Sequence, residues 1–393
     1  MATTDASSDD GGPVAGEPAA AARSARHSML VLCPYPVGVA AAQRLKFEQY
    51  YDDWRAAGWT IDVAPFMDLE LWRVAYERGR LTQKVIGTLA GYMRRFRDLT
   101  RVRRYDLVYC AMYVTPVGTS LFERAVRALS RRLVYDIEDN VHVGLNRETV
   151  DHPNPILRLI RGAGKISFLI RRADHVITSS PFLNEACLRI NDRKACTYIS
   201  SSVDTQRFVP RNPYANDRTV VIGWTGTFSS RPYLDLLRPM FQELAKRRKF
   251  RLRVIGNFDY ELPGVDLEVV RWTADREVED LQAIDVGVYP LPADEWVTGK
   301  SGLKAIQYMA FGLPCVATEV GTTPMIIRDG ENGLLVRNDD EWLSALIHLI
   351  DDPALRRRLG EQARKDAVRR YSTSAVAGDY RAVLESVIGS SGC

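Results

Sequence analysis

The sequence predicts an α/β protein in which two doubly wound, Rossmann-like domains face each other across a cleft. The chain has 393 residues, which is more than one hydrophobic core usually supports and is typical of two domains. Short apolar runs alternate with helical stretches in two successive sets, and a polar stretch at residues 210–218 separates the sets. Sheets of this kind bind ligands beyond the carboxyl ends of their strands.

The first set begins with an apolar strand at residues 29–33, and a Pro/Gly-rich loop at 34–38 follows it. A helix or loop separates each later strand from the one before, so we expect the strands to be parallel. The further strands are expected at 60–64, 105–110, 132–137, 174–178 and 197–200, and the helices at 43–57, 120–130 and 181–188.

The second set repeats this order and ends in a run of helices. Its strands are expected at 220–224, 251–255, 267–270, 285–289 and 314–318. Its helices are expected at 232–247, 277–283, 301–311, 339–350, 353–371 and 373–388.

The two sets give the expected domain bounds. Residues 1–27 are rich in Ala, Gly, Ser and Asp and lack the basic-then-apolar order of a signal peptide, which predicts a disordered tail. We expect an N-terminal domain at 28–209 and a C-terminal domain at 210–372. For the last segment, 373–393, we expect a helix, and one alternative is that it packs back on the N-terminal domain.

The composition excludes several classes of protein. Apolar residues make up 46% of the chain and charged residues 26%, and the net charge is only +4, which does not indicate a nucleic-acid-binding protein. The six cysteines are scattered without a Cys-x-x-Cys pair, which favours a reduced, cytoplasmic compartment. Neither the cysteines nor the five histidines show metal-ligand spacing, so we expect no metal and no cofactor.

The most unusual local feature is a pair of lysines, Lys300 and Lys304, at the expected start of a helix. The positive end of a helix dipole disfavours a cation there by ~0.3–1 kcal/mol. The unpaired amides of a first helical turn also bind anions. The lysine pair therefore predicts that a phosphate or diphosphate binds between the two side chains. A solvated charged face is the alternative.

Several further motifs lie at strand ends and in the turns that follow them. They are Ser200–Asp204, Gly223–Gly226, Val254–Gly256, Tyr289–Pro292, Gly299–Lys300, Gln307–Pro314, Thr318–Gly321 and Asp329–Leu335. With them, the chain from about residue 28 onward resembles the retaining nucleotide-sugar glycosyltransferases of the two-domain GT-B fold (glycosyltransferase family 4-like, or glycosyl transferases group 1). The resemblance implies a hexosyltransferase that uses a nucleotide diphosphate sugar and needs no metal.

The chain departs from this family in one respect. Relatives commonly carry two glutamates seven residues apart at the helix start, and Lys300 and Gln307 stand in their places. The second glutamate usually holds ribose hydroxyls, and Gln307 keeps both a donor and an acceptor for that role. Positions 300, 304 and 307 share one helical face by their spacing. We therefore expect Lys300 and Lys304 at the diphosphate and Gln307 one turn deeper, at the ribose.

A glycine turn is a second candidate for the donor phosphates. Gly226 and Thr227 follow a strand and precede a helix, where the backbone can approach a phosphate closely. Arg231 is the nearby cation, either gripping the diphosphate or lying on the surface.

Three other residues complete the donor side. Gly256 ends a strand in one of the motifs of the resemblance. Trp272 borders the nucleobase or is a tryptophan at the edge of the core. Glu295 lies near the donor sugar or belongs to a solvated acidic loop.

Carboxylates follow the expected strand 132–137 on the other side of the cleft. Glu138 and Asp139 stand where relatives often have a His-Asp pair near the reacting sugar. Carboxylates there can stabilise oxocarbenium-like charge or orient the acceptor hydroxyl, so Glu138, Asp139 and Lys300 are the catalytic candidates. Helix capping by Asp139 or Asn140 is the alternative. The acceptor-side candidates are Gly38, Arg44 and His142.

The sequence thus predicts a retaining glycosyltransferase of cell-surface polysaccharide or glycoconjugate biosynthesis. Its partners would be a nucleotide-sugar donor and a saccharide, lipid-linked or small-molecule acceptor. The basic stretch 94–104 could dock on anionic lipids at the inner face of the plasma membrane, or be an ordinary basic helix. A metal-independent nucleotide-sugar epimerase and a non-catalytic nucleotide-sugar-binding scaffold are the alternative functions.

Overall fold

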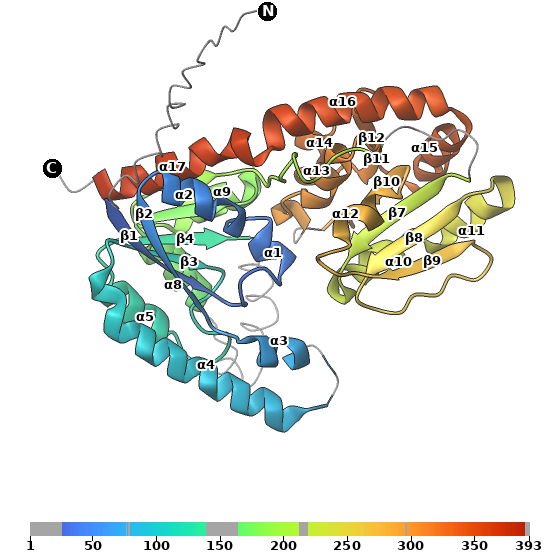
Figure 1. Ribbon diagram of the computed structural model, residues 1–393. Coiled ribbons are helices and arrows are strands. Elements are labelled where there is room, and N and C mark those ends of the chain that lie inside the picture. Colours follow the sequence, from blue (N-terminus) through green and yellow to red (C-terminus); the bar gives the residue numbers. More distant parts are fainter. Residues whose placement is uncertain are drawn as a thin grey trace, which may run out of the picture.

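The computed structural model describes residues 26–75, 77, 79–138, 164–211, 219–294 and 297–389. Two six-stranded sheets, each with helices on both faces, make up an N-terminal and a C-terminal unit that lie side by side (Figure 1). Every strand pair in both sheets is parallel. The predicted fold class, two doubly wound parallel α/β units, is confirmed.

The N-terminal sheet has the strand order β2-β1-β3-β4-β5-β6. Its strands are β1 (His27–Cys33), β2 (Trp59–Pro65), β3 (Leu107–Ala111), β4 (Leu133–Ile137), β5 (His175–Thr178) and β6 (Cys196–Tyr198). The helical segments of this unit are α1 (Ala41–Arg44), η1 (Glu48–Tyr50), α2 (Tyr51–Ala56), α3 (Leu69–Ala75), α4 (Leu81–Arg101), η2 (Val102–Arg104), α5 (Leu121–Leu129), α8 (Lys165–Arg172) and α9 (Pro181–Ile190).

The C-terminal sheet has the order β12-β11-β10-β7-β8-β9. Its strands are β7 (Val221–Gly226), β8 (Arg251–Gly256), β9 (Leu267–Arg271), β10 (Val286–Tyr289), β11 (Cys315–Thr318) and β12 (Gly333–Val336). The helical segments of this unit are η3 (Phe228–Ser230), α10 (Arg231–Asp235), α11 (Arg238–Arg247), α12 (Glu277–Gln282), η4 (Val297–Gly299), α13 (Leu303–Ala310), α14 (Thr323–Ile326), α15 (Asp339–Asp351) and α16 (Pro353–Tyr371). The last helix of the chain is α17 (Thr373–Gly389).

The last two helices belong to different units. Ala363 and Ala367 of α16 are part of the C-terminal core, whereas Val376 and Leu384 of α17 pack with β1, β3 and α2 in the N-terminal core. Ser372, between the two helices, forms a parallel β-bridge with Val203. Near Val203 the chain first passes from the N-terminal to the C-terminal unit. The chain therefore passes between the units twice, at adjacent points.

Two helices predicted as continuous are interrupted. The stretch 43–57 forms α1, η1 and α2, because Lys46 turns inward to bind the end of β4. The stretch 232–247 forms α10 and α11, and Pro239 lies in the first turn of α11. A proline removes a helix hydrogen bond and clashes with the preceding turn.

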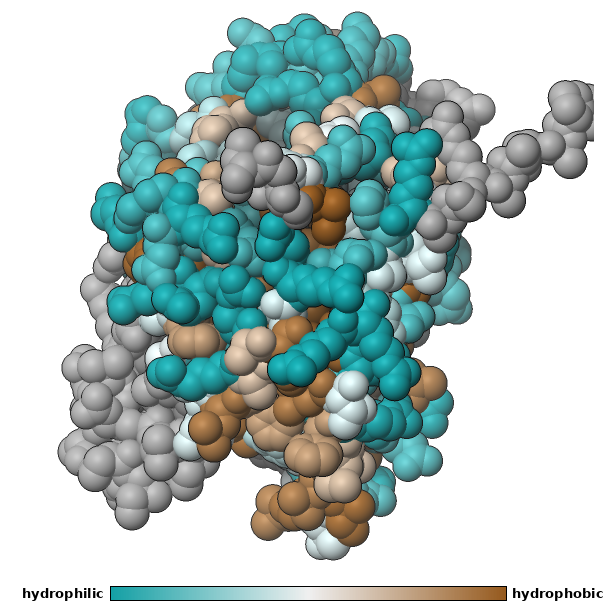
Figure 2. All heavy atoms as spheres, turned by 90° about the vertical axis from the view of Figure 1, so that its left-hand side faces the viewer, coloured by the Kyte–Doolittle hydropathy of each residue, from teal (hydrophilic) through white to brown (hydrophobic). Residues whose placement is uncertain are grey.

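Helix α4 has an inverted arrangement of its polar and apolar faces. Arg95 and Asp98 are buried against the sheet, while the large apolar side chains of the helix face outward, at the lower end of the view in Figure 2. The sequence analysis found only a basic stretch here, since the hydrophobic periodicity of α4 marks its exposed face rather than its buried one. Among the described residues, no helix is long and apolar enough to cross a membrane.

The buried guanidinium of Arg95 joins the ends of two strands to the segment that follows a third. It donates hydrogen bonds to the carbonyl oxygens of Cys33 at 2.7 Å, of Ala64 at 2.6 Å and of Val114 at 2.7 Å. It also pairs with Asp98 at 3.1 Å. Charged donors to buried carbonyls are among the stronger hydrogen bonds, so Arg95 holds the carboxyl ends of β1 and β2 against the chain that follows β3.

We predict that Arg95→Met lowers the free energy of unfolding by about 3 kcal/mol, because three buried carbonyls lose their charged donor and Asp98 loses a partner. Urea unfolding followed by circular dichroism measures this. Arg97→Met, at an exposed position of the same helix, is the matched control and should change stability by no more than about 0.5 kcal/mol. Equal stability of the two variants would contradict the role given to Arg95.

Candidate functional site

The candidate site lies at the carboxyl edge of the C-terminal sheet, where the strand order reverses. β7 pairs with β10, so the chain proceeds to β8 on one side of this pair and to β11 on the other. Helices that leave the sheet at such a point diverge, which opens a crevice beyond the carboxyl ends of the strands. The glycine turn of Gly226 and Thr227 lies at the end of β7, and the segment with Lys300 and Lys304 follows β10.

The ammonium group of Lys304 lies over this point of reversal. Its nitrogen is 4.5 Å from the ring centroid of Trp224 in β7 and 5.9 Å from that of Tyr289 in β10. It is also 3.4 Å from the hydroxyl oxygen of Ser230 in the glycine turn. Cation–π contacts stabilise a charged ammonium by about 0.5–2 kcal/mol, so the two rings keep a cation in a place that the helix dipole disfavours.

Close packing fixes the helix that carries Lys304. A Cβ on Gly287 would lie 2.3 Å from the ring of Tyr308 in α13, so only glycine admits the ring at this point of β10. The Tyr308 hydroxyl accepts a hydrogen bond from the amide of Thr225 at 3.1 Å. Burial raises the pKa of Tyr308, so the hydroxyl stays neutral. Helix α13 is therefore held against both strands of the switch point.

Lys300 lies before the helix rather than in it. Helix α13 begins at Leu303, with Gly302 as its N-cap, so the predicted start at residue 301 and the shared helical face of positions 300, 304 and 307 are wrong for Lys300. Its amide donates to the Val297 carbonyl at 2.9 Å, and its carbonyl accepts from the Thr322 hydroxyl at 2.8 Å. The backbone of Lys300 is thus fixed in a short loop beside the helix start.

The glycine turn packs closely beneath Lys304. A Cβ on Gly226 would lie 2.4 Å from Trp224 and 2.6 Å from the Ser230 hydroxyl. The side chains of Thr227 and Ser230 cap each other's backbone amides. Gly256, at the end of β8, faces Gly226, since a Cβ there would lie 2.7 Å from the Gly226 carbonyl oxygen. These three predicted donor-side residues therefore meet at one place.

The other donor-side candidates lie around this centre. Gln307 is buried on α13, one turn beyond Lys304. Arg231 begins α10, where it pairs with Asp235 at 3.4 Å and lies over the Tyr260 ring at 5.8 Å. It is half-exposed, which is the arrangement expected of the surface alternative.

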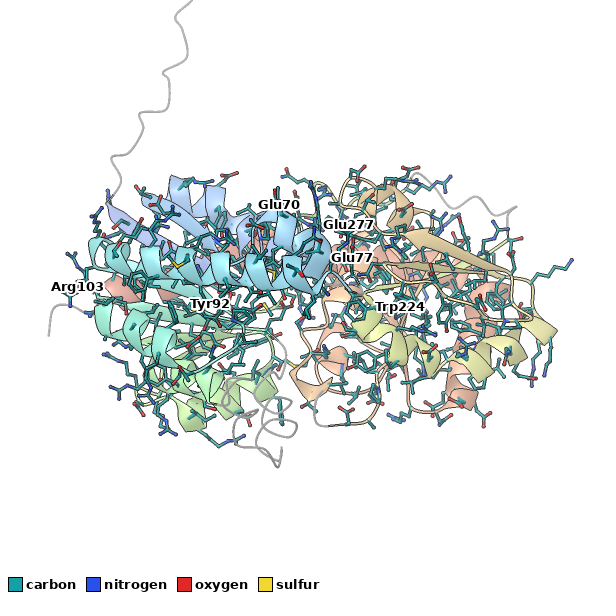
Figure 3. All side chains as sticks on the ribbon, turned by 90° about the horizontal axis from the view of Figure 1, so that it is seen from below. Glu70, Glu77, Tyr92, Arg103, Trp224 and Glu277 are labelled. Atoms are coloured by element: carbon teal, nitrogen blue, oxygen red, sulfur yellow. The ribbon has the colours of Figure 1, made fainter. Side chains whose placement is uncertain are left out.

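An ion pair joins the two units beside this site. One nitrogen of Arg44 in α1 donates to both carboxylate oxygens of Glu277 in α12, each at 2.8 Å. Arg44 also lies over the Trp272 ring at 5.9 Å, and Arg207 approaches Glu277 at 3.7 Å. Glu277 lies at the boundary of the units (Figure 3). Arg44, predicted on the acceptor side, and Trp272, predicted on the donor side, are thus brought together.

Glu277 is a residue that the sequence analysis missed. It is only 3% exposed, and its partner lies 233 positions earlier in the chain. The only local signal was an acidic residue in the first turn of a helix, which is common for reasons of dipole alone. The other two nitrogens of Arg44 are buried and have no hydrogen-bond partner among the described residues.

The loop that carries Gly38 is held by the side chains of Gln43 and Glu48. The Gly38 amide donates to Glu48 at 2.8 Å. Gln43 accepts from the Tyr35 amide at 2.9 Å and donates to the Tyr35 carbonyl at 3.0 Å and to Glu48 at 2.9 Å. Burial raises the pKa of Glu48, although its bonds from Gly38 and Gln43 oppose the shift. These contacts position the loop after β1.

The end of β4 is anchored by a buried ion pair. Lys46 lies 2.8 Å from a carboxylate oxygen of Asp136 and donates to the Ile137 carbonyl at 3.0 Å. The Tyr109 hydroxyl donates to the same carboxylate. Burial and the charge of Asp136 raise the pKa of Tyr109, so this donor stays protonated. Glu138 is the next residue in the chain after this anchored strand end.

Three predicted site residues, Asp139, His142 and Glu295, lie outside the described residues. In the part of the chain that the structure describes, no group of three or more His, Cys, Asp or Glu side chains is placed to hold a metal ion.

A known family model matches most of the C-terminal unit. Residues 219–352 match the family model of glycosyl transferases group 1. This segment covers β7 to α15 and so includes Trp224, the glycine turn and Lys304.

Two relatives found by sequence comparison are named as glycosyltransferases. The chain is 29% identical over 211 residues to a D-inositol 3-phosphate glycosyltransferase of Corynebacterium aurimucosum, which covers 46% of this chain and 48% of that protein. It is also 29% identical over 196 residues to an MMP alpha-(1->4)-mannosyltransferase of Mycolicibacterium hassiacum, over 47% of each protein. The chain thus spans about half the length of these relatives, or less.

Solved structures match nearly the whole chain. The sucrose-phosphate synthase of Thermosynechococcus elongatus superposes with a TM-score of 0.69 at 19% identity, over 93% of this chain and 100% of that one. Anabaena HepE in complex with UDP-glucose superposes with a TM-score of 0.61 at 16% identity, over 92% and 100%. At such identities the match establishes the shared GT-B fold. Residues 219–352 of this chain are therefore similar to the glycosyl transferases group 1 family, in a molecule whose described residues have the GT-B fold.

Proposed function

We propose that the chain is a retaining glycosyltransferase that moves a hexose from a nucleotide diphosphate sugar to a saccharide, lipid-linked or small-molecule acceptor. The position of Lys304 is the observation that carries this proposal. A cation held over two aromatic rings at the switch point, next to a glycine turn, is suited to a diphosphate. The names of the relatives support the same reaction class, and the retaining outcome rests on the family.

The leaving group explains why cations are needed. When the bond between the anomeric carbon and the phosphate oxygen breaks, negative charge develops on the diphosphate. Preorganised cations and amides stabilise such charge better in the transition state than in the ground state. Lys304 and Lys300 would supply this stabilisation, at roughly 1.5–3 kcal/mol for each charge-assisted contact.

The remaining donor roles follow from the same arrangement. Gln307 is one turn deeper on α13, which supports a ribose contact, and Gly256 lies against Gly226. We assign Trp272 to the nucleobase side and keep Glu295 as a candidate for the sugar. Arg231 is the weakest donor candidate, because it pairs with Asp235.

The acceptor would lie toward the N-terminal unit. Glu138 follows the anchored end of β4, and we propose that it and Asp139 orient the acceptor hydroxyl or stabilise charge at the sugar. Arg44 retains two buried donor nitrogens in addition to its pair with Glu277, which supports a role in acceptor binding with Gly38 and His142. We propose domain bounds of 28–209 and 210–372, and a cytoplasmic protein that attaches peripherally to the plasma membrane.

We predict that Lys304→Met and Lys300→Ala each weaken binding of the nucleotide-sugar donor at least tenfold, because each removes one charge-assisted contact with the diphosphate of about 1.5–3 kcal/mol. Methionine keeps the apolar stem of Lys304 on Trp224. Titration calorimetry with UDP-, GDP- and dTDP-sugars gives the affinities. Lys246→Ala, an exposed position on α11, is the control. Wild-type affinity in both site variants would rule out the diphosphate assignment.

We predict that Glu138→Gln lowers the rate constant of transfer at least tenfold while donor affinity changes less than twofold, because Glu138 lies on the acceptor side. Radiolabelled nucleotide sugars are incubated with and without a membrane extract as acceptor source. Acceptor-dependent release of the nucleoside diphosphate supports a transferase. Interconversion of the sugar without acceptor would show an epimerase, and binding without turnover a scaffold.

A further inference from the structure

Three helices form one outer layer on the N-terminal unit. Val126 of α5 and Ile166 and Leu169 of α8 share a core cluster with β3 and β4, and Leu99 of α4 packs against the same cluster. Helix α4 contacts α5, and α5 contacts α8. Figure 1 shows α4 as the outermost element of this layer, at the lower edge of the molecule. The outward sides of the three helices therefore belong to one face, which we call the outer face.

A continuous apolar stripe runs along the outer face on α4. Six large apolar side chains of this helix are between 50% and 74% exposed, namely Leu81, Val85, Ile86, Leu89, Met93 and Phe96. Their spacing of mostly three or four residues places them on one side of the helix, over roughly 22 Å at 1.5 Å per residue. Figure 2 shows hydrophobic side chains gathered at this end of the molecule. Contiguous exposed patches of this kind mark interaction sites.

The segment that carries the stripe is strongly basic. Residues 80–104 contain eight Lys or Arg residues and a single acidic residue, Asp98. Asp98 is buried and pairs with Arg95 and Arg101, so it contributes no negative charge to the surface. Arg94 is also bound internally, to Asp68 and Phe66. Arg97, Arg103 and Arg104 are exposed.

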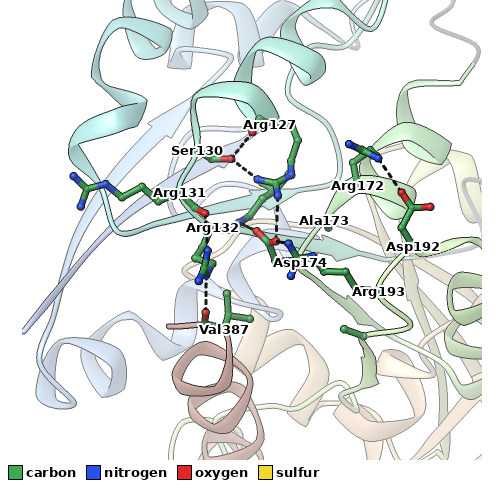
Figure 4. A network of polar contacts seen from close by, with 12 residues as sticks. Arg127, Ser130, Arg131, Arg132, Arg172, Ala173, Asp174, Asp192, Arg193 and Val387 are labelled. Carbon is green, nitrogen blue, oxygen red and sulfur yellow. Dashed lines mark hydrogen bonds and ion pairs between the residues drawn. The ribbon is translucent and has the colours of Figure 1, made fainter. Parts of the chain in front are cut away.

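A hollow lined by arginines continues this charge onto α5 and α8. It has a volume of about 730 Å³, and its lining residues are Arg124, Arg127, Ala128, Ser130, Arg131, Phe168, Arg171 and Arg172. Figure 4 shows two carboxylates that pair with arginines of this hollow. Arg127 pairs with Asp174 and Arg172 with Asp192, each at 3.1 Å. Arg131 also pairs with Asp106, at 3.3 Å. Five arginines against three carboxylates leave the hollow with an excess of positive charge.

We propose that the outer face docks on an anionic lipid bilayer. The α4 stripe would lie at the boundary between headgroups and acyl chains, and the arginine hollow would receive headgroup phosphates. A second copy of the chain fits this face less well, since a twofold contact would bring the same arginines against each other. In the sequence analysis, the basic stretch 94–104 is the element that could dock on lipids. In this proposal the apolar side of α4 contacts the bilayer, and the arginines flank that contact.

Sedimentation of the full chain with lipid vesicles tests the proposal. We expect binding to vesicles of phosphatidylglycerol and phosphatidylcholine but not to phosphatidylcholine alone, and weaker binding as salt is raised. The double variant Leu89→Glu/Met93→Glu should bind at least tenfold more weakly, because two charges enter the stripe. Val368→Glu, an exposed apolar position on α16, is the matched control and should bind like the wild type.

The arginine hollow is tested separately. Arg124→Gln and Arg171→Gln should each weaken binding to anionic vesicles about fivefold, the effect of one basic residue near such a surface. Equal binding to neutral vesicles, or no loss in the stripe variant, would overturn the proposal. A dimer in solution that the stripe variant dissociates, without vesicle binding by the wild type, would instead assign the face to a second copy. Unchanged thermal unfolding shows that the variants are folded.

Discussion

The close approach of helix α13 to strands β7 and β10 is the constraint on which the candidate site depends. It requires glycine at position 287, because the Tyr308 ring occupies the space of a side chain there. The bond from Thr225 to the Tyr308 hydroxyl then fixes the helix along the strand. Only with the helix in this place does Lys304 reach both Trp224 and Tyr289. The electrostatics of the site are thus a product of packing behind it, which offsets the unfavourable position of a lysine at a helix start.

A second set of contacts holds the two units together. Arg44 and Glu277 form a buried ion pair between them, and Leu45 joins the core cluster of the C-terminal unit. The chain crosses at Val203 and again at Ser372, and these residues are paired. The cost of desolvating a buried ion pair offsets much of its Coulomb attraction, so such a pair adds little to the free energy of folding. It does fix the relative positions of the two side chains. Its position beside Trp272 makes this pair a link between the donor-side and acceptor-side residues.

In helix α4, the need to anchor the strand ends on the buried side is linked to the apolar side chains on the exposed side. The ends of β1 and β2 need a donor for their carbonyl groups, and Arg95 provides it from the buried side of α4. A helix whose inward side holds a guanidinium and a carboxylate has fewer apolar contacts with the sheet. Its apolar side chains point outward instead. The anchoring of the strand ends and the apolar stripe of the outer face are therefore two sides of the same helix.

The sequence by itself determined the parallel strands of both sets except β12, and many of their helices, because hydrophobic periodicity is a local property; helices α3, α8 and α14 were not expected. The strand predicted at 29–33 and the helix predicted at 353–371 agree with β1 and α16, and the glycine turn and Lys304 were identified by residue type and position. Tertiary structure alone decided the rest. Glu277 meets a partner 233 residues away, Lys300 lies outside the helix, and α4 turns its apolar side outward. Each of these depends on burial and charge pairing between residues distant in the chain, which a local pattern does not encode.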